Sequence, residues 1–187
     1  MRSNIEAARY GRVAIVLHWV IAALVLTNIA LGLIFANSAA AESGISPLPP
    51  LHKSIGLTVL VLSVLRLGWR LTHAAPPLHG PFSRIARATH ILFYVLLIAT
   101  PLAGWALVSV SPRGIPTVYF HLFTWPHMGF LHALPIQVRR HEISNFVDLH
   151  NSLAFLSLGL IVLHVAGALY HQFRGDDTMR RMLNWRG

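Results

Sequence analysis

The chain contains no cysteine. This absence excludes disulfides, cysteine-ligated iron–sulfur clusters, thiolate zinc fingers and covalent attachment of a c-type haem through a C-x-x-C-H motif. Charge is also scarce, because only 11% of the 187 residues are charged, against about 25% in an ordinary soluble domain. Apolar residues make up 55% of the chain. This composition excludes intrinsic disorder and argues against a soluble globular fold.

The basic residues give a formal net charge of +9 but are spread thinly and flank apolar blocks. This placement is typical of membrane topology, so no nucleic-acid partner is expected. Four apolar stretches are each long enough to cross a bilayer as a helix, which satisfies its own backbone groups in lipid. They run over residues 13–35, 51–71, 86–110 and 148–173. We therefore predict an all-α, integral membrane four-helix bundle, with residues 1–187 as a single domain.

The distribution of basic residues predicts the orientation. Eleven of them lie before the first span, around the loop joining the second and third spans, or after the fourth span, and four lie on the other side. The positive-inside rule then places both termini of this multi-pass membrane protein in the cytoplasm. Residues 37–42 resemble a signal-peptidase site, but the preceding apolar run is longer than the 7–15 residues of a signal peptide. We expect the first span to be retained.

The external loop over residues 111–147 is long and rich in aromatic residues, and a loop of that length is more often functional than a plain connector. Its histidines are at positions 121, 127, 132 and 141, without a ligand spacing typical of a metal site. The role of this loop stays open at this stage.

Four histidines lie in or at the edges of the spans, where an ionisable residue indicates a functional site. His150 and His164 are 14 residues apart, about 21 Å of helical rise, on nearly the same face of the fourth span. His18 lies in the inner part of the first span, and His52 begins the second span at its outer end. Because neighbouring spans run in opposite directions, the depths match in two pairs, His18 with His164 and His52 with His150.

Two imidazoles at equal depth on different helices suit one b-type haem, held without a covalent bond because cysteine is absent. Each pair is therefore predicted to ligate one haem iron, inner for His18 and His164, outer for His52 and His150. With both axial positions filled, such a site suits electron transfer rather than oxygen binding. The simpler interpretation of any one of these histidines is a hydrogen bond between helices.

In order and spacing, the motifs of the chain resemble the bacterial cytochrome b561 family over nearly the whole length. The residues that carry the resemblance are Arg9-Tyr10-Gly11, Leu17-His18-Trp19, Leu51-His52-Lys53-Ser54-Ile55-Gly56, His90 with Tyr94, His150 with His164, and His171-Gln172-Phe173 followed by Asp176-Asp177-Thr178-Met179-Arg180-Arg181-Met182.

The resemblance implies an inner-membrane cytochrome with two haem b groups, in which His18, His52, His150 and His164 fall on the positions of the haem ligands. It implies electron transfer between the periplasmic face and membrane quinone, and in one branch of the family an oxidoreductase that oxidises superoxide with ubiquinone. Other relatives only carry electrons as subunits of larger complexes. The expected partners are membrane lipid, quinone, and superoxide or another periplasmic donor, and a homo-oligomer is compatible with the sequence.

Several further residues have two or more interpretations. Lys53, Arg66 and Arg70 are candidate partners of haem propionates, and Lys53 also a candidate attractor of an anion; the alternative is contact with lipid headgroups. His90 is a candidate contact of quinone or a propionate, an alternative ligand to His18, or an interfacial histidine. No residue is assigned a catalytic role.

Two alternative functions remain open from the sequence. One is a haem-carrying membrane anchor of a periplasmic dehydrogenase. The other is a haem-free, histidine-lined transporter of protons or a divalent metal. The transporter is disfavoured because such sites recruit carboxylates within the spans, and all six acids of this chain lie outside the spans or at their ends.

Overall fold

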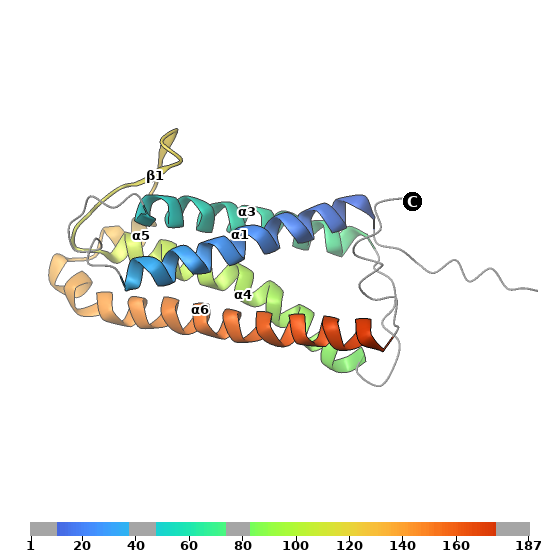
Figure 1. The fold of residues 1–187 in the computed structure, drawn as a ribbon. Helices are drawn as coiled ribbons and strands as arrows, with labels where there is room; N and C mark the ends of the chain where they lie inside the picture. The colour runs from blue at the N-terminus through green and yellow to red at the C-terminus, as the bar shows by residue number, and fades with distance from the viewer. Residues whose placement is uncertain (1–10, 38–47, 74–82, 175–187) are drawn as a thin grey trace, which may run out of the picture.

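The computed structural model describes residues 11–37, 48–73 and 83–174. Within these ranges four long helices lie side by side along a common direction (Figure 1). They are α1 (Arg12–Ala36), α3 (Leu48–Thr72), α4 (Ser83–Val110) and α6 (Ile136–Phe173). Each is long and apolar enough to cross a membrane. The structure thus confirms the all-α, four-helix membrane architecture.

Three predicted features lie wholly or largely outside the described residues: the signal-peptidase-like segment at 37–42, most of the loop between the second and third spans, and the C-terminal motif at 176–182.

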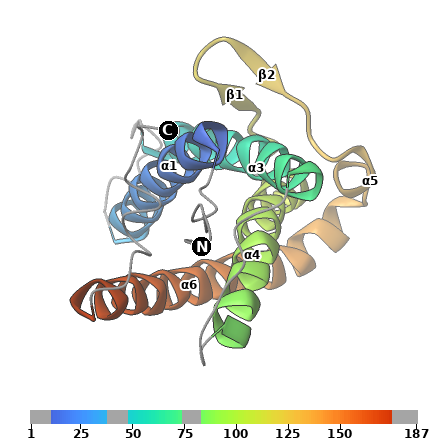
Figure 2. The same ribbon diagram turned by 90° about the vertical axis from the view of Figure 1, so that its right-hand side faces the viewer.

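The helices contact one another in the order α1–α3–α4–α6 (Figure 2). A cluster of buried branched side chains joins the first two helices, with Ile21 and Val25 of α1 packed against Ile55 and Val59 of α3. Many other large apolar side chains remain exposed on the outside of the bundle, Leu163 at 70% among them. Such a surface is stable where it faces lipid rather than water.

The helix bounds follow from proline placement and from charge. Pro49 and Pro50 occupy the first turn of α3, and Pro135 immediately precedes α6, positions where a missing N–H costs nothing. The helix α6 begins twelve residues before the predicted start of the fourth span. Residues 136–147 carry charges, so their hydropathy does not mark a span, yet they contain no glycine or proline and the helix continues through them.

The rest of the segment predicted as the external loop contains regular structure, for which no prediction was made from the sequence. It contains the strands β1 (Thr117–Tyr119) and β2 (Phe123–Trp125), which pair antiparallel, and the short helix α5 (Gly129–His132). Phe120 and His121 in the turn have φ angles of 44° and 62°. Each left-handed non-glycine residue costs about 1–2 kcal/mol, and this turn type ordinarily uses asparagine and glycine.

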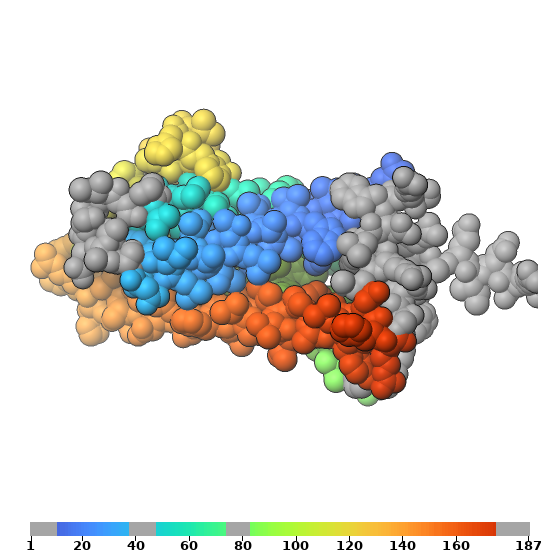
Figure 3. Space-filling model, in the orientation of Figure 1, coloured from blue at the N-terminus to red at the C-terminus, as the bar shows by residue number. Residues whose placement is uncertain are grey.

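The hairpin is fastened to the outer turns of α3. The Phe120 N–H donates to Ser54 Oγ over 3.0 Å, and the hydroxyls of Thr58 and Tyr119 are hydrogen-bonded at 3.0 Å. The hairpin projects sideways from the bundle beside α3 (Figures 1 and 2), and its atoms stand against the outer part of that helix in Figure 3. Two buried hydroxyl contacts therefore fix the level of the hairpin along the bundle.

Candidate functional site

His52 of α3 and His150 of α6 face each other at the end of the bundle that carries the hairpin, which the charge distribution predicts to be the outer end and which we call outer. Their ring centroids are 6.1 Å apart, and the ring planes are nearly perpendicular at 89°. Nδ1 of His52 lies 3.0 Å from the backbone carbonyl oxygen of Asn28 on α1. Nδ1 of His150 lies 3.0 Å from the backbone carbonyl oxygen of Thr100 on α4. Because a carbonyl only accepts, each Nδ1 carries the proton and donates. Nε2 of both rings therefore keeps its lone pair available for a metal.

A glycine makes each of these hydrogen bonds accessible. Gly32 follows Asn28 by four residues on α1, and Gly104 follows Thr100 by four residues on α4. A helical carbonyl points toward the residue four positions later, whose side chain would cover it. A Cβ at Gly32 would lie 3.1 Å from His52 Cε1, and a Cβ at Gly104 would lie 3.0 Å from His150 Cε1. Both imidazoles therefore occupy space that only glycine leaves.

The inner pair consists of His18 of α1 and His164 of α6, with ring centroids 6.3 Å apart. His90 of α4 is also close, its ring centroid 6.1 Å from that of His164. Nη1 of Arg66, from α3, lies 3.1 Å from His18 Nδ1. All four helices thus contribute a side chain to the inner cluster.

The inner pair differs from the outer pair in its hydrogen bonding. A guanidinium only donates, so His18 Nδ1 accepts from Arg66 and the proton of the neutral ring is on Nε2. Ligation of a metal through Nε2 requires the opposite tautomer. His18 would therefore have to give up its hydrogen bond from Arg66, which would leave that cation free for an anionic group.

Each histidine pair suits a metal ion whose other ligands come from a cofactor rather than from the protein. In the described parts of the chain, no three His, Asp or Glu side chains come together as candidate metal ligands. Two imidazole nitrogens at about 2 Å from a shared metal would separate their ring centroids by about 6 Å, close to the values in both pairs. A haem supplies four nitrogens in its plane and needs only two axial ligands from the protein. The residues present therefore fit two bis-imidazole haems.

Basic side chains gather around His127, in the segment between α4 and α6. The pKa of His127 is lowered, first by burial and then by electrostatic interaction with His132, Lys53 and Arg139. The rings of His127 and His132 stack face to face with centroids 4.5 Å apart, which is not an arrangement in which both ligate one metal. The neighbour of His52, Lys53, therefore belongs to a cationic group at the outer end, whereas Arg70 is exposed near the inner end.

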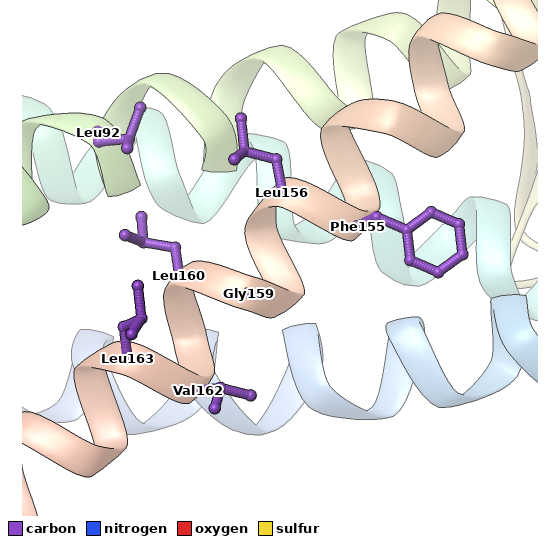
Figure 4. A pocket seen from close by; sticks show the side chains of 7 residues that line it. All are labelled: Leu92, Phe155, Leu156, Gly159, Leu160, Val162 and Leu163. Carbon is purple, nitrogen blue, oxygen red and sulfur yellow. The ribbon is translucent and has the colours of Figure 1, made fainter.

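An apolar groove of about 580 Å³ runs along α6, with Leu92 of α4 on one side of it (Figure 4). Its α6 residues lie between His150 and His164 in the sequence. Its lining contains no hydrogen-bonding side chain, and Phe155 on its edge is 61% exposed. The groove suits a hydrocarbon chain rather than a polar headgroup. It is lined by Leu92, Phe155, Leu156, Gly159, Leu160, Val162 and Leu163.

Comparison with known proteins agrees with this geometry. The family model described as prokaryotic cytochrome b561 matches residues 9–185. The chain belongs to this family. The family is one of membrane-bound b-type cytochromes, so membership implies a multi-pass bacterial membrane protein that binds b-type haem and takes part in electron transport.

Individual relatives cover almost the whole chain. It is 33% identical over 180 residues to cytochrome b561 homolog 2 of Escherichia coli, covering 94% of this chain and 91% of the relative. It is 27% identical over 180 residues to the probable superoxide oxidase CybB of Yersinia pestis, covering 94% and 96%. Cytochrome b561 homolog 1 of E. coli is 25% identical over 181 residues, covering 94% and 97%.

Sequence reasoning missed the residues that orient the outer histidines. It considered only the histidines themselves, whereas Gly32 and Gly104 act on them from the neighbouring helices. The signal present in the sequence is a glycine four residues after Asn28 and again four residues after Thr100. That spacing can be recognised as a histidine-binding feature only when the structure shows which histidine lies against the glycine.

We expect Gly104→Ala to weaken the outer haem site. The added methyl group would meet the His150 ring at 3.0 Å, and overpacking of this kind costs about 1–3 kcal/mol. Haem content per chain should fall, and the midpoint potential of the outer haem should shift, in a redox titration of the purified protein. Gly68→Ala on α3 is the control, because Gly68 is exposed and a Cβ there meets nothing within 4 Å. Identical titrations for the two variants would contradict the role of Gly104.

Proposed function

We propose that the protein transfers electrons through two b-type haems, from a one-electron donor at the periplasmic face to quinone in the bacterial inner membrane. The observation that carries the proposal is the pair of histidine clusters at two depths, with ring separations of 6.1 Å and 6.3 Å. His150 and His164, one from each pair, are separated on α6 by about 21 Å of helical rise. Such a spacing connects the two halves of a bilayer.

The haem, when bound, supplies reversible one-electron chemistry at its iron. His52 and His150 would hold the outer haem, with both Nδ1 protons fixed by backbone carbonyls. His18 and His164 would hold the inner haem. A haem held by both histidines of a pair would have no free position for dioxygen, so such a site would be suited to electron transfer. Arg66, beside His18, is the best-placed partner for an anionic propionate, and Lys53 and Arg70 are weaker candidates.

Superoxide is the donor that the external surface supports best. One of the relatives bears the printed name of a probable superoxide oxidase, and Lys53 and Arg139 place positive charge near His127. A positive field at the entrance raises the encounter rate of a small anion. Two superoxide anions would reduce one quinone with two protons, giving two dioxygen molecules and one quinol. The chain would then act as a superoxide:ubiquinone oxidoreductase.

Quinone would be bound from within the bilayer. The groove along α6 has the apolar lining that an isoprenoid tail requires, and His90 near His164 is a candidate contact for the quinone head. The protein would remain in the membrane throughout, with both termini in the cytoplasm.

The histidine pairs can be separated by substitution. We expect two haem b per chain in the parent protein, extractable with acid acetone, and one after each single change. His52→Ala and His150→Ala should leave the same residual haem, with one midpoint potential, because both remove the outer site. His18→Ala and His164→Ala should leave the other. Matching residual spectra for His18→Ala and His52→Ala would show that the pairing is wrong, and His90 would be the next candidate ligand.

Superoxide should reduce the haems of the purified protein, and added ubiquinone should reoxidise them with formation of quinol. Because the attraction is electrostatic, the rate should fall with ionic strength, and Lys53→Gln should lower it by roughly two- to fivefold at low salt. Arg84→Gln, at the opposite end of the bundle, is the control and should leave the rate unchanged. The measurement is stopped-flow absorbance with a continuous superoxide source. Haem reduction that is unaffected by superoxide dismutase would exclude superoxide as the donor.

The orientation has its own test. A reporter that is active only in the cytoplasm should be active when fused after Gly187, and a reporter active only in the periplasm should be active when inserted beside Gly129. The reason is the excess of basic residues on the side of the termini. The opposite pattern would reverse the assignment of the two pairs to the membrane faces.

A further inference from the structure

The β1–β2 hairpin exposes large apolar side chains that no other part of the described chain covers. Leu122 is 76% exposed, Phe123 is 50% exposed and Phe120 is 40% exposed. Residues 117–125 contain four aromatic side chains and no charged one. An exposed cluster of this composition on a water-facing loop is unfavourable and marks an interaction surface.

The level of the hairpin along the bundle is set by its contacts with α3. The Phe120 N–H is bound to Ser54, and the Tyr119 hydroxyl is bound to Thr58. These α3 residues lie about 3 Å and 9 Å further along the helix axis than His52, toward the middle of the bundle. His52 itself is level with His150, where the apolar part of α6 begins. The hairpin therefore stands at the edge of the apolar layer, not above it.

The direction in which the hairpin points is also informative. It extends away from the bundle on the side of α3, across the helix axes rather than along them (Figures 1 and 2). Its apolar tip thus lies on the same side as the part of α3 that faces away from the bundle. On that part of α3, Val61, Val64 and Leu65 are 45%, 51% and 58% exposed. That surface of α3 faces lipid in a membrane-spanning bundle. The tip of the hairpin and this side of α3 therefore both present exposed apolar side chains on the same side of the bundle.

We propose that the hairpin over residues 117–125 is an interfacial anchor, which inserts Phe120, Leu122 and Phe123 among the lipids of the leaflet nearest the outer histidine pair. Trp and Tyr, which the hairpin has at positions 125 and 119, are the side chains enriched at this depth of a bilayer. Trp105 of α4 holds the base of the hairpin, since its Nε1–H donates to the Pro126 carbonyl at 2.8 Å and its ring contacts Trp125. Through Ser54, the anchor fixes the depth of the first turns of α3, two residues from His52.

The absence of cysteine allows a direct test, because a single introduced cysteine carries the only label. Leu122→Cys, modified with a nitroxide, is placed in lipid nanodiscs of phosphatidylcholine and phosphatidylglycerol with one chain per disc. Collision with dioxygen reports apolar surroundings, and collision with a polar nickel chelate reports water. We expect the ratio of oxygen to nickel collisions at position 122 to be several-fold higher than at Gln137→Cys, on the polar start of α6. It should approach the ratio at Leu65→Cys.

A ratio at position 122 equal to that at Gln137→Cys would overturn the proposal, because the tip would then be in water. A second copy of the chain is the other candidate for covering the tip. In that case, the label would be shielded from both reagents in vesicles with many copies, would show dipolar coupling to a second label, and would become water-accessible in single-chain discs. This result would also overturn the lipid anchor, in favour of an interface between copies.

Discussion

Each histidine of the outer site depends on the same interaction. Its imidazole N–H donates to a backbone carbonyl that already accepts a hydrogen bond within its own helix. A carbonyl oxygen has two lone pairs, so Asn28 and Thr100 can each accept a second hydrogen bond without breaking the helix. The residue that would shield such a carbonyl stands four positions later, and there the chain has Gly32 and Gly104. The two bonds cross between contacting helices, from α3 to α1 and from α6 to α4, so they tie the orientation of the ligands to the packing of the bundle.

The inner cluster is built on a different principle. His18 accepts from Arg66 instead of donating to backbone, and His90 stands beside His164. The proposed ligands of the outer site are therefore held by neutral main-chain groups, whereas those of the inner site lie among ionisable side chains. Positive charge near an iron centre favours its reduced state, and a neutral surrounding does so less. With a haem in each proposed site, this contrast would give the two haems different potentials although both have a pair of histidine ligands.

The membrane spans and the proximity within the two pairs could be predicted because both follow from simple periodicities. Apolar length marks a span, and opposite helix directions fix which histidines share a depth. The supporting residues could not be predicted, since Gly32 has meaning only relative to the ring of His52 on another helix. The hairpin was missed for a local reason: its turn uses Phe120 and His121 at positive φ, where the recognisable signal is asparagine–glycine. The early start of α6 was missed because its first residues are charged.

That α6 supplies one histidine to each pair restricts how the gene can change. Inserting or deleting a single codon between His150 and His164 would turn one ring by about 100° relative to the other and shift its depth by about 1.5 Å. Both sites could not then keep their partners on α1 and α3. Substitutions in this interval are tolerable wherever the side chain only faces lipid, but its length is not free to vary. Among descendants of this gene, the interval should therefore diverge in composition while its residue count stays constant.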